Sequence, residues 1–93
     1  MLFIVTHKHA PESCPSDNPA QVHQVVNEEH VKASGVKLLG SYVAPPEHVL
    51  FFVLEADEYA QVVRYLQPIM KIGSIDVVPV QTVAEAMSIF PTR

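Results

Sequence analysis

The sequence predicts one α+β domain whose elements run in the order β-α-β-β-α-β. Its 93 residues suit a single domain, residues 1–93. Four short runs are rich in β-branched and aromatic residues and are bounded by proline, glycine or polar residues, as strands are. Two longer segments between them repeat apolar residues at helical spacing. Hydrophobic residues make up 48% of the chain, which is typical of a globular protein.

The first half of the chain predicts a strand, a loop and a helix. Residues 2–7 (LFIVTH) are apolar and β-rich, whereas residues 8–18 contain prolines and small polar residues and predict a loop. The Asn-Pro pair at 18–19 predicts a helix start, because asparagine caps free N–H groups and proline fits the first turn. We expect this helix to run to about Ser34, with Gly35 just past its end.

The middle of the chain predicts two strands and a second helix. Residues 36–44 and 48–55 are apolar strands, and Pro-Pro-Glu at 45–47 forms the turn between them. Asp57 is the predicted cap of the helix that follows. The apolar stripe predicted for this helix consists of Tyr59, Val62, Val63, Leu66, Ile69 and Met70.

The last part of the chain predicts an edge strand and a short tail helix. Pro68 is expected to loosen or end the last turn of the second helix, and residues 74–80 form the fourth strand. Pro79 lacks an N–H group, so this strand is expected at an edge of the sheet. A tail helix is predicted from about 83 to 89.

This order of elements predicts a ferredoxin-like sandwich. Two crossovers that share a central hairpin give a four-stranded antiparallel sheet with both helices on one face. The expected spatial order of the strands is 4-1-3-2, which places the Pro79 strand at an edge.

The strands are too apolar for a sheet with one covered face. Residues 49–54 are six apolar residues in a row, and residues 2–5 are four. Both faces of these central strands are therefore apolar, and an exposed apolar face marks a partner site. We expect a homodimer that packs sheet against sheet. The alternative is that the tail helix folds over the open face.

The chain resembles the dimeric α/β-barrel superfamily over nearly its whole length. The resemblance rests on the element order, the opening Leu-Phe-Ile-Val and the closing Asp-Val-Val-Pro-Val. That superfamily includes cofactor-free monooxygenases, haem-degrading enzymes and muconolactone isomerases. Within it, the chain is similar to a bacterial nickel-binding ferredoxin-like group, which also has histidines at the end of strand one and Val-Pro near the C-terminus. The loop at 8–17 departs from that group.

The predicted topology brings histidines to one end of the sheet. Strands one and three are antiparallel neighbours, so the end of the first meets the start of the third, and we expect His7 to lie close to His48. His30 is expected about 16 Å down the first helix from Pro19, at a rise of about 1.5 Å per residue. It is therefore left out of the predicted metal ligands. The predicted ligands are His7, His9, Cys14 and His48, with His23 as a fifth candidate.

Imidazole and thiolate ligands suit a divalent transition metal, namely nickel, zinc or copper. The expected role is metal sensing, buffering or sequestration. The alternative is that these histidines are solvated and the domain is a plain interaction module.

A second hypothesis is a cofactor-independent enzyme. Glu29 falls within the apolar stripe of the first helix, and burial would raise its pKa and make it a general base, with His30 beside it. The resemblance implies an oxygenase- or isomerase-like reaction in a cavity between sheet and helices. The alternative is that Glu29 reaches solvent.

Composition argues against several other functions. The net charge is −4 and no basic stripe is present, which argues against nucleic acid and anionic lipid as partners. The three glycines are isolated, so no nucleotide or flavin motif is present. No signal peptide or membrane span is expected, and a single cysteine suits the cytoplasm.

Overall fold

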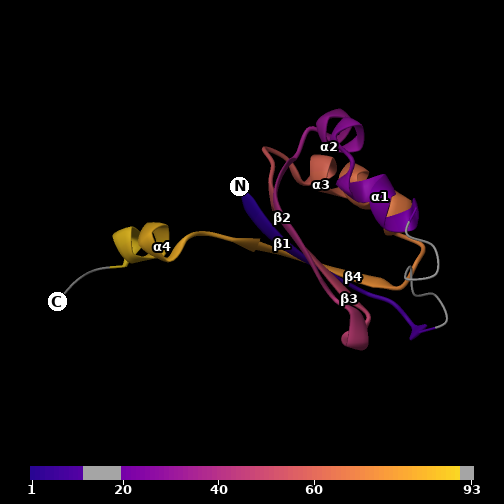
Figure 1. Ribbon diagram of the computed structural model, residues 1–93. Coiled ribbons are helices and arrows are strands. Elements are labelled where there is room, and N and C mark those ends of the chain that lie inside the picture. The colour runs from indigo at the N-terminus through magenta and orange to yellow at the C-terminus, as the bar shows by residue number, and fades with distance from the viewer. Residues whose placement is uncertain (12–19, 91–93) are drawn as a thin grey trace.

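The computed structural model describes residues 1–11 and 20–90, and it contains a four-stranded antiparallel sheet (Figure 1). The strand order is β2-β3-β1-β4, which confirms the predicted order and puts Pro79 on an edge strand. The strands are β1 (Leu2–Lys8), β2 (Lys37–Ala44), β3 (Val49–Glu55) and β4 (Ser74–Val80).

Three helices lie on one face of this sheet, and a fourth lies beyond its end (Figure 1). The three are α1 (Ala20–Val26), α2 (Glu28–Ser34) and α3 (Tyr59–Leu66), and the fourth is α4 (Val83–Ile89). Short 3-10 turns, η3 (Pro45–Glu47) and η4 (Gln67–Ile69), precede β3 and follow α3.

The first predicted helix is interrupted, so the prediction of one continuous helix was wrong. Asn27 separates α1 from α2 with an extended backbone (φ −75°, ψ 146°). Its side-chain oxygen accepts a hydrogen bond from the N–H of His30 at 2.8 Å, and its amide donates to the carbonyl of His23 at 2.7 Å. Asparagine competes in this way with the helical backbone, which favours a cap over a helix interior.

The start of α3 also differs from the prediction, because Glu58 occupies the capping position in place of Asp57. The Gln61 side-chain oxygen accepts hydrogen bonds from the N–H groups of Asp57 and Glu58, at 2.9 and 3.0 Å. These two bonds satisfy free N–H donors at the start of the helix.

The core lies between the sheet and the helices. Alternate residues of β1 and β3 face inward, because successive side chains of a strand point to opposite sides. On α3 and η4 the buried residues are Val62, Tyr65, Leu66 and Ile69, which repeat at i, i+3, i+4 and i+7. Tyr65 was missed by the predicted stripe, whereas Tyr59 and Met70 are exposed.

The outer face of the sheet is apolar and exposed. It carries three exposed large hydrophobic residues, one on each of three neighbouring strands: Ile4 on β1, Phe51 on β3 and Val78 on β4. Helix α4 does not fold over this face but projects past the end of β4 (Figure 1). In the parts of the chain that the structure describes, no helix has the length and hydrophobicity needed to cross a membrane.

Candidate metal centre

The ends of β1 and β3 bring two histidines together. The antiparallel register pairs Lys8 with Val49, and the N–H of His9 donates to the carbonyl of His48 at 3.1 Å. His9, rather than His7, therefore lies opposite His48. His7 lies two residues before His9 and points to the same side of the sheet.

The three imidazole rings form a cluster, which we call the histidine triad: His7, His9 and His48. Ring centroids are 5.7 Å apart for His7 and His9, and 5.4 Å apart for His9 and His48. His7 is 1% exposed and His9 is 5% exposed, on the side of the sheet that the helices cover. Buried polar residues of this kind are uncommon without partners.

Most ring nitrogen atoms of the triad have no hydrogen-bond partner among the described residues. These buried atoms are Nδ1 of His7, both ring nitrogens of His9 and Nδ1 of His48. A buried polar group without a partner costs about 1–3 kcal/mol. Four such atoms therefore lie within one cluster, and no group of the described residues is their partner.

The other ring nitrogen of His7, Nε2, determines the tautomer of the neutral ring. His7 Nε2 is hydrogen-bonded to the backbone carbonyl of Ile72, just before β4. A carbonyl can only accept, so Nε2 carries the hydrogen and Nδ1 of the neutral ring keeps a free lone pair. Histidines that bind metals are commonly held by such a bond to a carbonyl.

His48 is held by an unusual backbone conformation. Its φ of 56° makes it the one non-glycine residue with positive φ among the described residues. Its N–H donates to the carbonyl of Pro45 at 3.1 Å and closes η3. Positive φ is uncommon for residues with a side chain, and it concentrates at functional sites.

An open groove of about 580 Å³ reaches the triad. Its lining includes His9 and His48 of the triad, together with Lys8, Glu47, Gly73 and Ser74. Gly73 has a φ of 78°, and a Cβ atom there would lie 2.1 Å from the Lys8 carbonyl oxygen. The absence of a side chain at Gly73 therefore lets the end of β1 approach this turn.

The other predicted ligands are not in the triad. His23 is exposed on α1, and Cys14 lies outside the described residues. His30 is separate, as predicted: its Nε2 atom lies 2.7 Å from the Tyr65 carbonyl oxygen, and its ring packs at 5.4 Å from the Tyr65 ring.

The triad does not hold a complete coordination sphere as it stands. Among residues 1–11 and 20–90, no three His, Cys, Asp or Glu side chains are already arranged so that they could hold a metal ion. Two imidazoles that bind one zinc ion, with N–Zn distances of about 2.0–2.1 Å, have ring centroids roughly 5 Å apart. The spacings of 5.4 and 5.7 Å are close to that value.

Residues 1–92 match a protein family described as a domain of unknown function, DUF3303. The chain belongs to the DUF3303 family. No curated protein and no solved structure matches the chain.

The pKa of His9 gives a testable property of this DUF3303 domain without metal. Burial lowers that pKa below its usual 6.5, and the nearby His7 and His48 lower it further. Below about pH 6.5 the unfolded chain binds a proton at His9 that the folded protein takes up only at lower pH, so stability falls as pH falls. Urea unfolding of metal-free protein between about pH 5 and 7.5 should show this slope.

The matched variant for this prediction is His9→Gln, which cannot titrate. Its free energy of unfolding should fall less steeply over the same pH range. Equal slopes for the two proteins would show that His9 titrates normally in the folded state.

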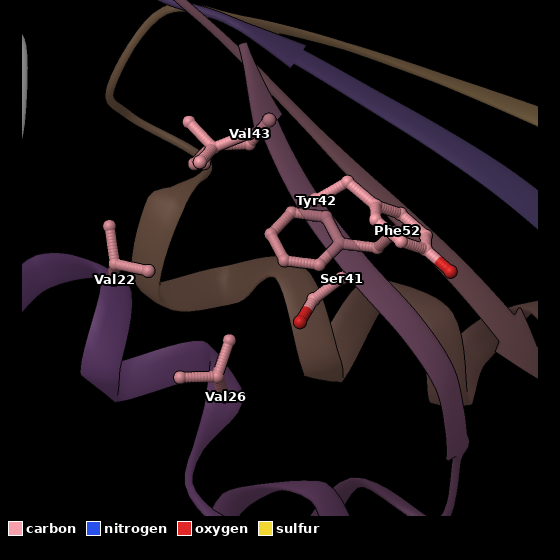
Figure 2. A pocket seen from close by; sticks show the side chains of 7 residues that line it. Val22, Val26, Ser41, Tyr42, Val43 and Phe52 are labelled. Atoms are coloured by element: carbon pink, nitrogen blue, oxygen red, sulfur yellow. The ribbon is translucent and has the colours of Figure 1, made fainter. Parts of the chain in front are cut away.

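The acid-base hypothesis depends on a buried Glu29. Glu29 is exposed, as in the alternative in which its side chain reaches solvent. A small apolar groove of about 120 Å³ does lie between α1 and β2, where Val22 and Val26 face Val43 (Figure 2). Neither Glu29 nor His30 lines that groove.

Proposed function

We propose that this DUF3303 domain binds a divalent transition-metal ion through His7, His9 and His48. The observation that carries this proposal is the set of four buried ring nitrogens that have no partner in the described chain. A metal ion accepts the lone pair of a neutral imidazole, and the lowered pKa of His9 favours that neutral form at pH 7. Cys14 stays a candidate for a further ligand, since three histidines leave a coordination position free.

Nickel, zinc and copper are the metals that suit this donor set. Imidazole binds all three, whereas calcium and magnesium prefer oxygen ligands. The groove beside His9 and His48 supplies a path by which an ion can enter and leave. Reversible access of this kind suits sensing, buffering or sequestration of the metal.

The proposal includes a homodimer of ferredoxin-like domains, arranged as a dimeric α/β barrel. The strand order and the helices on one face support the fold assignment. The exposed side chains of Ile4, Phe51 and Val78 on the outer sheet face support a second copy as its cover.

Calorimetric titration of untagged, metal-free protein with nickel, zinc or copper salts tests the proposal directly. We expect saturable binding of one ion per chain for at least one metal, and a higher melting temperature in its presence. Elemental analysis of the protein as purified gives the natural metal. Absence of both heat and a melting shift with all three metals would refute metal binding.

A further inference from the structure

Helix α4 is an apolar segment with no buried residue, and no other described element packs on its apolar side chains. Val83, Met87, Ile89 and Phe90 are between 58% and 79% exposed. Val83, Met87 and Phe90 repeat at i, i+4 and i+7, so they form one apolar stripe. Glu85 and Ser88 lie on the other side of the helix.

The length of α4 implies that something else stabilises it. The helix has seven residues, whereas isolated helices shorter than about 12–15 residues are marginal in water. Its cap is well formed, because the Thr82 hydroxyl oxygen accepts from the N–H of Glu85 at 3.1 Å. A cap contributes about 1 kcal/mol, which does not replace the tertiary contacts of an amphipathic helix.

We propose that α4 is an exchanged arm that packs its apolar stripe on the outer sheet face of a second copy of this chain. This inference rests on the proposed homodimer and names the segment that completes it. At about 1.5 Å per residue α4 is about 10 Å long, enough to cover two strands spaced about 4.8 Å apart. The receiving face presents Ile4, Phe51 and Val78, which are exposed.

The surface area of the chain fits a partner of this size. A compact monomer of 10.3 kDa exposes about 5,400 Å². This chain exposes 6335 Å², an excess of roughly 900 Å² over that expectation. Stable interfaces bury about 800 Å² on each partner, so one symmetric dimer would cover the excess.

Two other surfaces could cover the apolar stripe of α4, namely the sheet of its own chain and a lipid surface, and both fit less well. Only Gln81 and Thr82 join β4 to α4, and Thr82 is extended (φ −68°, ψ 156°), so the chain leaves its own sheet without a reversal. A lipid surface would favour Lys or Arg on the polar side of the helix, but α4 carries Glu85 and no basic residue.

Sedimentation of the full untagged chain measures whether the arm holds the dimer. We expect a wild-type dimer at micromolar concentrations, and Met87→Glu should weaken it by roughly thirtyfold or more. Ser88→Glu adds the same charge on the polar side of α4 and should change the dimer constant less than about threefold. Phe51→Glu should also dissociate the dimer, because it places a charge on the receiving face.

The pattern among these variants separates the arm from the sheet-face dimer. If Phe51→Glu dissociates the dimer but Met87→Glu does not, the dimer stands and the arm proposal is wrong. A monomeric wild-type chain would refute both, whatever the metal titration gives. A monomer that cosediments with phosphatidylcholine or phosphatidylserine vesicles would assign the stripe to lipid and also overturn the arm proposal.

Disulfide trapping identifies the surface that receives the arm. In a Cys14→Ser background, chains with Met87→Cys are mixed with chains with Phe51→Cys and oxidised. A disulfide-linked pair of different chains supports exchange. A chain that carries both substitutions and closes an internal disulfide as a monomer would show that α4 folds onto its own sheet.

Discussion

Replacing His9 with alanine is expected to reduce metal affinity by at least about 100-fold. His9 is the central ring of the triad, 5.7 Å from the His7 ring and 5.4 Å from the His48 ring. Changes to groups that only orient a metal ligand cost about 10–100-fold, so the loss of a ligand itself should cost at least as much. Calorimetric titration of the metal-free variant with the metal that the wild type binds measures the change.

The same variant separates binding from folding. In the metal-free protein His9→Ala removes two buried nitrogen atoms that have no partner, which offsets part of the packing that is lost. We therefore expect its melting temperature without metal to change by only a few degrees. His23→Ala is the matched control, because His23 is exposed on α1, and it should bind metal as the wild type does. Wild-type affinity in His9→Ala would exclude this ring as a ligand.

Gly73→Ala is expected to produce the largest loss of stability among single small substitutions near the site. The new Cβ would lie 2.1 Å from the Lys8 carbonyl oxygen and 2.9 Å from the His9 Cα atom, and both are backbone atoms that cannot rotate away. The φ of 78° adds strain for any residue with a side chain. We expect the free energy of unfolding to fall by about 3 kcal/mol or more, measured by urea denaturation.

Gly35→Ala is the matched control for this effect. Gly35 also has a positive φ, of 82°, but its added Cβ would meet the end of the Gln61 side chain, which can move. The expected loss is about 1–2 kcal/mol. Metal affinity should fall roughly tenfold or more in Gly73→Ala, because the backbone that carries His9 must shift, and should be unchanged in Gly35→Ala. Equal losses of stability in the two variants would contradict the close approach at Gly73.

The sequence predicted the elements that depend on local chemistry. The structure has strands at the four apolar runs, a turn at Pro45–Glu47 and the tail helix at 83–89, as the sequence predicted. The interruption at Asn27 was missed. Asparagine within a helical pattern can either continue the helix or cap a new one, and the packing of the folded chain decides between the two. The burial of Tyr65 was missed for a related reason, since the apolar stripe of α3 is set by what the sheet presents to it.

The candidate site was predicted in part. Antiparallel neighbours must bring the end of one strand to the start of the other, so the meeting of β1 and β3 followed from topology. The register did not follow from topology, and it places His9 rather than His7 opposite His48. The Ile72 carbonyl that holds His7 gave no signal in the sequence, because backbone groups look alike in every residue. The close approach of Gly73 to the backbone of Lys8 and His9 could not be predicted from an isolated glycine in the sequence.

The order of strands and helices, the apolar character of both sheet faces and the abundance of histidines can all be predicted from the amino-acid sequence. These properties are encoded residue by residue, through propensity, periodicity and composition. Three features became visible only in the folded chain: which histidines share a buried space, which ring nitrogens lack a partner among the described residues, and where α4 points. These features depend on register and on contacts between residues far apart in the sequence, such as the bond from His9 to His48, and no local pattern carries that information.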